Sequence, residues 1–122
     1  MLGAGLFLAL GDLLGQRDNA QAGAISMRIS MGGYNPAVLT ATPGQTLMVD
    51  WWNTDNAMHL DGGIHTLVAP TLGISETLAA ESRRTIEITA PNTPGDYDFW
   101  CDSCCGGKAN PQMHGVLRVR AT

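Results

Sequence analysis

The sequence predicts an all-β protein, an antiparallel sandwich or barrel of seven or eight short strands that follows a short N-terminal helix. Three observations favour this class. Several short segments alternate apolar and polar side chains, or are rich in β-branched and aromatic residues, as strands are. Turns that use many of the 15 glycines and 6 prolines separate these segments. Strands do not alternate with helical segments, so a parallel sheet crossed by helices is not expected.

The size and charge of the chain narrow the possible functions. It has 122 residues, of which 44% are hydrophobic and 15% charged, and such a domain buries about 65% of the surface of its unfolded chain. The net charge is −4 and there is a single lysine. Nucleic-acid binding requires a concentrated basic surface, so we expect one folded domain without a nucleic-acid partner.

Residues 1–23 differ in character from the rest of the chain. Leucines recur there at helical spacing on one stripe, at Leu2, Leu6, Leu10 and Leu13. This pattern predicts a helix over residues 2–16, whose apolar run is shorter than the ~20 residues that cross a bilayer. Ala20–Ala22 looks like a signal-peptide cleavage site. The segment is therefore a signal-peptide remnant, part of a membrane anchor, or a helix that packs on its own domain or on a second copy.

Residues 24–122 form the predicted β domain. Its first strand alternates, and the face that carries Ile25, Met27, Ile29 and Met31 is expected to be buried. Ile86 and Ile88 are likewise expected to point inward, with Glu87 outward. Further strands are predicted at residues 37–42, 46–53, 66–69, 84–90, 96–100 and 115–120, with turns at 32–36, 43–45 and 91–95.

All three cysteines lie in the connection between the last two predicted strands, at Cys101, Cys104 and Cys105. Met113 and His114 stand at the far end of the same connection. Thiolate, thioether and imidazole groups together suit copper better than any hard cation. This connection therefore predicts a copper site.

A second candidate lies in the loop before the strand at 66–69. His65 follows a Gly-Gly turn, which places an imidazole at the start of that strand, and we predict that it is a copper ligand. His59 and Met58 stand in the same loop. An exposed histidine and a surface or gap-filling methionine are the commoner uses of such positions, so neither is counted as a ligand.

After residue 24 the chain resembles the cupredoxins. The resemblance rests on Asn35–Pro36, Pro43–Gln45, Asn53, Ile64–His65, Tyr97–Cys101 and Met113 with Gly115. Within that superfamily the chain is most similar to the dinuclear copper (CuA) domain of cytochrome c oxidase subunit II. Cys101 and Cys105 reproduce the Cys-x-x-x-Cys of that domain, and Ile64–Ile74 looks like its His-containing segment. The resemblance implies a Greek-key sandwich that binds one or two copper ions.

The resemblance also implies a role for each residue of the site. His65 would be the first imidazole ligand, and Cys101 and Cys105 would be the thiolates. Met113 would be the weak thioether ligand, and Ser103 would offer its backbone carbonyl.

The sequence departs from the CuA pattern in the same loop. Asn110 stands where that family has its second histidine, and asparagine is a poor copper ligand. The loop is also one residue longer, contains the extra thiol of Cys104, and places His114 directly after Met113. Three solutions stay open: His114 replaces the missing histidine, Cys104 does, or one copper is held mostly by sulfur.

A rigid β frame that holds soft donors in place suits electron transfer, because fixed ligands keep the reorganisation small. Hydrogen bonds to the sulfurs would tune such a site. A Cu(I) chaperone or copper sensor is the alternative, and the partner is accordingly a redox protein or a copper acceptor. Closely spaced thiols outside the cytosol need a metal or a disulfide. We expect a domain of the cell envelope, periplasmic or otherwise extracytoplasmic, with possible membrane association through residues 2–16.

Other uses of the cysteines fit less well. A thioredoxin-like Cys-x-x-Cys needs a helix to follow it, and Gly106, Gly107 and Pro111 do not allow the opening turns of one. The spacing matches no common zinc pattern, and a structural disulfide would leave one cysteine over. Neither loop contains a base–nucleophile pair or paired carboxylates, so an enzyme is not expected.

Overall fold

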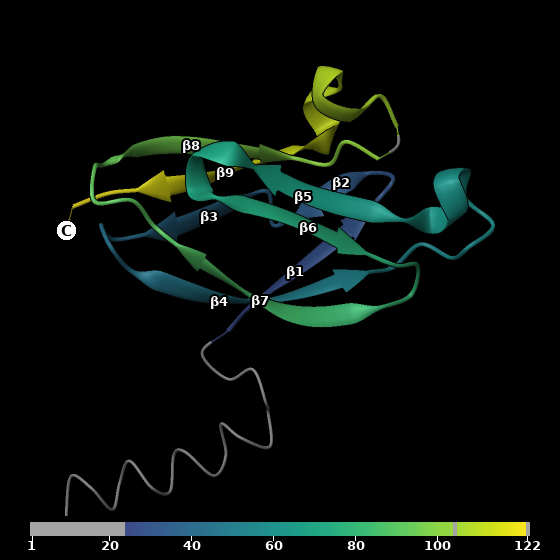
Figure 1. Cartoon of the computed structure of the whole chain (residues 1–122), viewed down its shortest axis with the longest axis horizontal. Helices are drawn as coiled ribbons and strands as arrows, with labels where there is room; N and C mark the ends of the chain where they lie inside the picture. The colour runs from purple at the N-terminus through teal and green to yellow at the C-terminus, as the bar shows by residue number, and fades with distance from the viewer. Residues whose placement is uncertain (1–23, 104, 122) are drawn as a thin grey trace, which may run out of the picture.

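Two β-sheets face each other in the computed structural model, which describes residues 24–103 and 105–121 (Figure 1). The first sheet has the strand order β2-β1-β4-β7, with bounds Gly33–Asn35, Ile25–Ser30, Thr46–Asn53 and Arg83–Thr89. The second has the order β3-β9-β8-β5-β6, with bounds Val38–Ala41, His114–Val119, Gly95–Trp100, His65–Ala69 and Ile74–Leu78. Four short 3-10 turns lie between strands: η1 (Leu60–Gly63), η2 (Pro70–Leu72), η3 (Gly107–Ala109) and η4 (Pro111–Met113). The all-β sandwich predicted from the sequence is confirmed.

The core lies between the inner faces of the two sheets, as the alternating pattern predicts. Its largest fully buried side chains include Trp51, Phe99, Met27, Ile29, Leu67, Ile88 and Leu117. Ile86 and Ile88 point inward and Glu87 is exposed, as expected. Met31 corrects one expectation: β1 ends at Ser30, so Met31 lies in the following turn and is 40% exposed.

The described residues form nine strands, more than the seven or eight predicted. One additional strand, β2, occupies a segment that was predicted to be only a turn. The other, β6, follows a turn at Gly73, whose backbone is left-handed. Both are short, and their pattern of three to five residues is too brief to separate a strand from a loop.

The expected antiparallel arrangement is wrong for two strand pairs. β1 and β4 pair in parallel, and so do β3 and β9, which makes both sheets mixed. The reason is that the chain crosses from the first sheet to the second at β3 and returns at β4. Alternation along a strand reports which face is buried and carries no information about the direction of its neighbour.

The predicted helix over residues 2–16 lies outside the described residues. Within the part of the chain that the structure describes, no helix is long and apolar enough to cross a membrane.

Two loops meet at one end of the sandwich and define the candidate site. The β4–β5 loop contains η1, and the β8–β9 loop contains η3 and η4; both lie at the right-hand end in Figure 1. The strand β2 supports the second of these loops from below. Gly33 has φ of 101°, and a Cβ built there would overlap the carbonyl oxygen of Gln112 in η4. The close approach explains why glycine is required at this position.

Candidate metal centre

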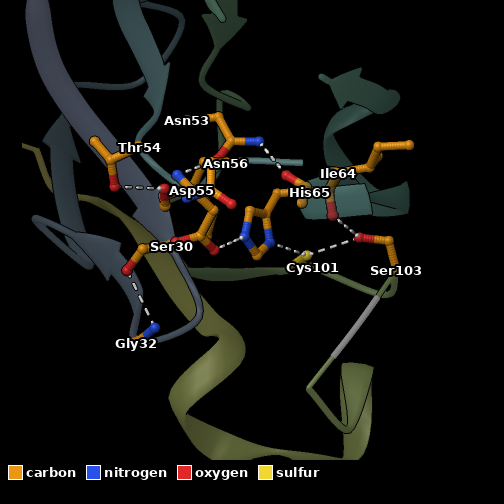
Figure 2. Close-up of polar contacts among 12 residues, drawn as sticks. Ser30, Gly32, Asn53, Thr54, Asp55, Asn56, Ile64, His65, Cys101 and Ser103 are labelled. Carbon is orange, nitrogen blue, oxygen red and sulfur yellow. Dashed lines mark hydrogen bonds and ion pairs between the residues drawn. The ribbon is translucent and has the colours of Figure 1, made fainter. Parts of the chain in front are cut away.

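His65 and Cys101 form the centre of the site. His65 opens β5 and Cys101 follows β8, and both are fully buried. The His65 Nδ1 atom lies 3.4 Å from the Cys101 sulfur, while Nε2 lies 2.7 Å from Asp55 Oδ2 on the other side of the ring. Figure 2 shows the imidazole held between these two groups. The structure therefore brings together an imidazole and a thiol that are 36 positions apart in the sequence.

The Cys101 sulfur accepts hydrogen bonds from its surroundings. The Thr66 backbone N–H donates to it over 3.3 Å, and the Ser103 hydroxyl lies at the same distance. Burial disfavours the thiolate, but the hydrogen bonds between Cys101 and His65, Ser103 and Thr66 outweigh it and lower the pKa of Cys101 to about 6. Burial also opposes protonation of His65, but its bonds to Cys101 and Asp55 raise its pKa overall. In the metal-free site the contact between the two groups thus lowers the pKa of the Cys101 thiol and raises the pKa of the His65 imidazole.

Asp55 fixes the orientation of the His65 ring, and Asn53 fixes the loop that contains Asp55. The Asn53 carboxamide is fully buried; its oxygen accepts from the Asp55 N–H, and its nitrogen donates to the Gly63 carbonyl over 2.7 Å. The same nitrogen lies 3.1 Å from the carbonyls of Leu78 and Ala79. One side chain therefore ties both ends of the β4–β5 loop to the strands beside it.

Met113 is fully buried at the end of η4. The Cys101 N–H donates to the Met113 carbonyl over 2.9 Å, which makes the two residues neighbours across the β8–β9 ladder. Met113 is therefore buried at the same end of the sandwich as Cys101, and the two residues are joined through their backbones.

Ser103 and Cys105 lie in the loop after Cys101. The Ser103 hydroxyl donates to the Ile64 carbonyl over 2.9 Å, so it joins the two loops of the site (Figure 2). Cys105 is half-buried against the core and has a left-handed backbone with φ of 60°. Cys104 lies outside the described residues.

Asn110, which takes the place of the second histidine of CuA domains, supports the backbone of the loop. Its side-chain nitrogen donates to the Cys105 carbonyl over 2.7 Å, and its oxygen accepts from the Gln112 N–H at the start of η4. The carboxamide thus has a hydrogen-bond partner at each of its ends, and both partners are backbone groups of the same loop.

His114 does not join His65 and Cys101. Its Nδ1 lies 2.9 Å from both Asp98 carboxylate oxygens, and its Nε2 lies 2.6 Å from the Lys108 carbonyl. Both partners only accept hydrogen bonds, so the ring donates from both nitrogens. The Lys108 carbonyl and the Asp98 carboxylate raise the pKa of His114 accordingly. β9 begins at this residue, and alternation sends Met113 to the core and His114 to the outside.

The donor set fits a copper ion in chemistry and in spacing. A tetrahedral ion at about 2.0 Å from nitrogen and about 2.3 Å from sulfur holds the two atoms about 3.5 Å apart, close to the 3.4 Å between His65 and Cys101. The set is soft, as copper prefers. Groups of three or more histidine, cysteine or carboxylate side chains arranged for a metal do not occur among residues 24–103 and 105–121. The thioether of Met113 is not of these types, so a mixed sulfur–imidazole site is the arrangement to consider.

Sequence reasoning missed Asp55 and Thr66. Thr66 could have been found from its position directly after His65 at the start of β5. Its backbone N–H points there toward β8 and donates to the Cys101 sulfur. Asp55 has a weaker signal: it is one of two aspartates in a polar loop, and only the fold shows which of them reaches the imidazole.

The two-sheet sandwich and the buried thiol–imidazole pair at one of its ends are the features by which this small β domain can be classified. The chain belongs to the family of cupredoxin-like domains, whose family model matches residues 3–119. The cupredoxin resemblance found in the sequence is thereby confirmed. No curated protein matches the sequence.

Solved structures support the fold. Reduced auracyanin from Roseiflexus castenholzii is similar with a TM-score of 0.54 and 22% identity, over 80% of this chain and 97% of that one. The metal-binding domain of the Cu(I)-exporting ATPase CopA from Streptococcus pneumoniae, solved with Cu(I), has a TM-score of 0.57 and 18% identity over 80% and 84%. The periplasmic domain of cytochrome oxidase subunit II from Bradyrhizobium japonicum has a TM-score of 0.57 and 11% identity over 80% and 83%.

Proposed function

We propose that the domain is an electron-transfer protein that carries copper at His65, Cys101, Cys105 and Met113. One observation carries the proposal: the His65 Nδ1 atom faces the Cys101 sulfur at 3.4 Å inside a buried, hydrogen-bonded frame. Copper bound there would supply a centre that gains and loses one electron.

The residues of this chain would keep the centre in one geometry through both oxidation states. Asp55 accepts from His65 Nε2, which leaves Nδ1 for the metal, and such a carboxylate makes the imidazole a more basic ligand. The Thr66 N–H donates to the Cys101 sulfur from within a strand, so that contact persists whether or not charge is added. A site held by strands and buried side chains reorganises little, and this is the property that fast electron transfer requires.

His114 and Asn110 are left out of the proposed ligand set. The nitrogens of His114 are engaged by Asp98 and Lys108, and the carboxamide of Asn110 by Cys105 and Gln112. The site then has one imidazole among soft sulfur donors, in contrast to the two imidazoles of the CuA pattern.

The single imidazole also favours a second candidate, a Cu(I) chaperone or sensor. Soft thiolate and thioether donors retain Cu(I), and fewer imidazoles stabilise Cu(II) less. The similarity of the fold to the metal-binding domain of a Cu(I)-exporting ATPase is compatible with this candidate. Its partner would be a copper-acceptor protein, whereas an electron carrier would need a redox protein.

An enzymatic use of the Cys101–His65 pair has little support. A thiolate beside an imidazolium is the arrangement of a nucleophilic catalyst. Here both side chains are fully buried, so a substrate has no access to the sulfur. We propose an extracytoplasmic location in the cell envelope, where a metal would protect the thiols from oxidation.

One experiment separates the two candidates. The purified protein is loaded with copper, and its absorption spectrum, paramagnetic-resonance spectrum and reduction potential are measured, with Cys101→Ser as the control. An electron carrier gives a Cu(II) signal that disappears on reduction and returns on oxidation without loss of metal. A silent Cu(I) form that resists oxidation and passes its metal to a soft chelator supports the chaperone. Equal copper binding by the protein and the Cys101→Ser variant would contradict both.

A further inference from the structure

The segment between Cys105 and Asn110 contains η3, whose own hydrogen bonds join Ala109 to Gly106 and Asn110 to Gly107. These bonds are internal and do not attach the turn to a sheet. A side chain on a neighbouring strand provides such an attachment.

His114 makes that attachment from β9. Its Nε2 donates to the Lys108 carbonyl in the middle of η3, and its Nδ1 donates to Asp98 on β8. The ring also lies beside Trp100, with centroids 5.9 Å apart, and the Lys108 ammonium lies 4.5 Å above the same indole. Backbone carbonyl, carboxylate and indole thus converge on one imidazole where β8 pairs with β9 in the register Trp100 to His114.

We propose that Asp98 and His114 are positioning residues that fasten η3, and with it Cys105, to the second sheet. The path is continuous: His114 holds Lys108, η3 leads to Asn110, and the Asn110 side chain donates to the Cys105 carbonyl over 2.7 Å. The relevance of this attachment rests on the proposed function, in which Cys105 is a copper ligand. It gives His114 a role that is different from that of a ligand.

The two possible roles of His114, positioning residue or copper ligand, predict different effects of replacing Asp98. If His114 were a ligand, Asp98 would be secondary and its loss would leave the copper spectrum largely intact. If His114 holds the loop, the Asp98 carboxylate orients the ring, and both residues contribute to one contact. Asp98 is 52% exposed, so replacing it leaves the core undisturbed.

The first test uses the metal-free protein, so it is independent of copper. Hydrogen exchange is followed at the Ala109 and Asn110 amides in Asp98→Ala and His114→Ala, with Asp96→Ala as the matched control on the same strand. Asp96 pairs with Arg118 and Arg120 and has no contact with η3. Because hydrogen bonds to charged groups are lost, exchange should be roughly 10- to 100-fold faster in both test variants and unchanged in the control.

The second test uses the copper-loaded protein. Release of Cu(I) to a soft chelator should accelerate by a similar factor in Asp98→Ala and His114→Ala, and both should keep the absorption spectrum of the unmodified protein.

Wild-type exchange rates in either variant would overturn the proposal, and so would a spectrum lost in His114→Ala but kept in Asp98→Ala. If the unmodified protein binds no copper, the proposed function fails, whereas the exchange measurement still decides whether these residues hold the loop. If His114→Ala does not fold, Asp98→Ala alone carries both measurements.

Discussion

At the scale of single residues, Asp55 fixes the orientation of the His65 ring and would thereby determine which ring nitrogen binds a metal. Its carboxylate is buried and lies 2.7 Å from Nε2, so the ring presents Nδ1 to Cys101. Without this partner the ring could rotate or bind through its other nitrogen. The neighbouring acidic residue, Asp61, is exposed and has no such contact with the ring.

Asp55→Asn should weaken Cu(II) binding by about 10- to 100-fold and raise the reduction potential, because a less basic imidazole stabilises Cu(II) less. Competition with a chelator of known affinity measures the first effect and voltammetry the second. Asp61→Asn is the control, since Asp61 has a left-handed backbone that asparagine tolerates. Equal affinities for the two variants would show that the carboxylate does not act through the ring.

The second residue-scale prediction concerns Cys101 in the metal-free protein. Its hydrogen bonds outweigh burial and lower its pKa to about 6, well below the ~8.5 of a free thiol. The thiol is therefore protonated below that pH and ionised above it. The ultraviolet absorbance of the thiolate, followed against pH, should show a midpoint near this value that Cys101→Ser abolishes and Cys105→Ser retains. A midpoint near that of a free thiol would mean that the hydrogen bonds do not favour the thiolate.

At the scale of secondary-structure elements, the β4–β7 pair has an ion pair on its outer face. Asp50 is 5% exposed, and both of its oxygens accept from Arg83, the shortest contact being 2.6 Å from Nη2. Arg83 also lies 5.6 Å from the ring centroid of Trp52, so the guanidinium is oriented from two sides. Such a bidentate contact is stronger than a pair on open surface.

Asp50→Asn should lower the free energy of unfolding by about 1–3 kcal/mol at neutral pH. The hydrogen bond from Arg83 lowers the pKa of Asp50 in the folded state, despite some burial. The stabilisation is therefore fully present above the unfolded pKa of ~3.9 and disappears as the pH falls through the lower folded value. Urea unfolding at neutral and strongly acidic pH should show the gap between the two proteins closing in acid. Asp96→Asn removes exposed ion pairs, which contribute little to stability, and should leave the free energy of unfolding nearly unchanged.

A second element-scale prediction concerns the contact between β2 and η4. Gly33→Ala places a Cβ on the Gln112 carbonyl and forces φ of 101° on a residue with a side chain, so we expect destabilisation of about 1–3 kcal/mol or more. Because η4 ends at Met113, copper affinity should fall as well. Gly62→Ala is the matched control: its φ is also positive, at 70°, but no atom lies within 4 Å of the added Cβ. Calorimetry and copper titration of both variants separate steric displacement of η4 from backbone strain alone.

At the scale of the whole molecule, the candidate site joins the two loops at one end of the sandwich, so binding and folding are linked. Copper should raise the free energy of unfolding by about 2.7 kcal/mol when its free concentration is 100 times the dissociation constant. Denaturant melts at increasing copper concentration test this relation. The Cys101→Ser protein should show little of the effect, and an equal gain in that variant would point to copper binding elsewhere.

Features of the fold and of the candidate site could be predicted from the sequence where they depend on residues that are close together in the chain. Features that depend on contacts between distant residues could not. Alternation predicts the burial of Ile86 and Ile88, and the clustering of cysteines identifies the loop after Cys101. The parallel pairings were not predictable, because they join strands that are far apart in the chain. The position of His114 next to Met113 makes it a candidate ligand in the sequence, and only the structure reveals Asp98 and Lys108 beside its ring.

The place of β9 in its sheet has a consequence for biosynthesis. β9 lies between β3 and β8, and among the strands of residues 24–103 and 105–121 β3 pairs only with β9. β3 therefore has no strand to pair with until residues 114–119 have left the ribosome. The second sheet can be completed only after that point. Met113 immediately precedes β9, so the strand that completes the second sheet also brings the Met113 carbonyl to the Cys101 N–H. A nascent chain up to residue 112 thus lacks both the complete sheet and Met113, and on the proposed function it would lack one of its copper ligands as well.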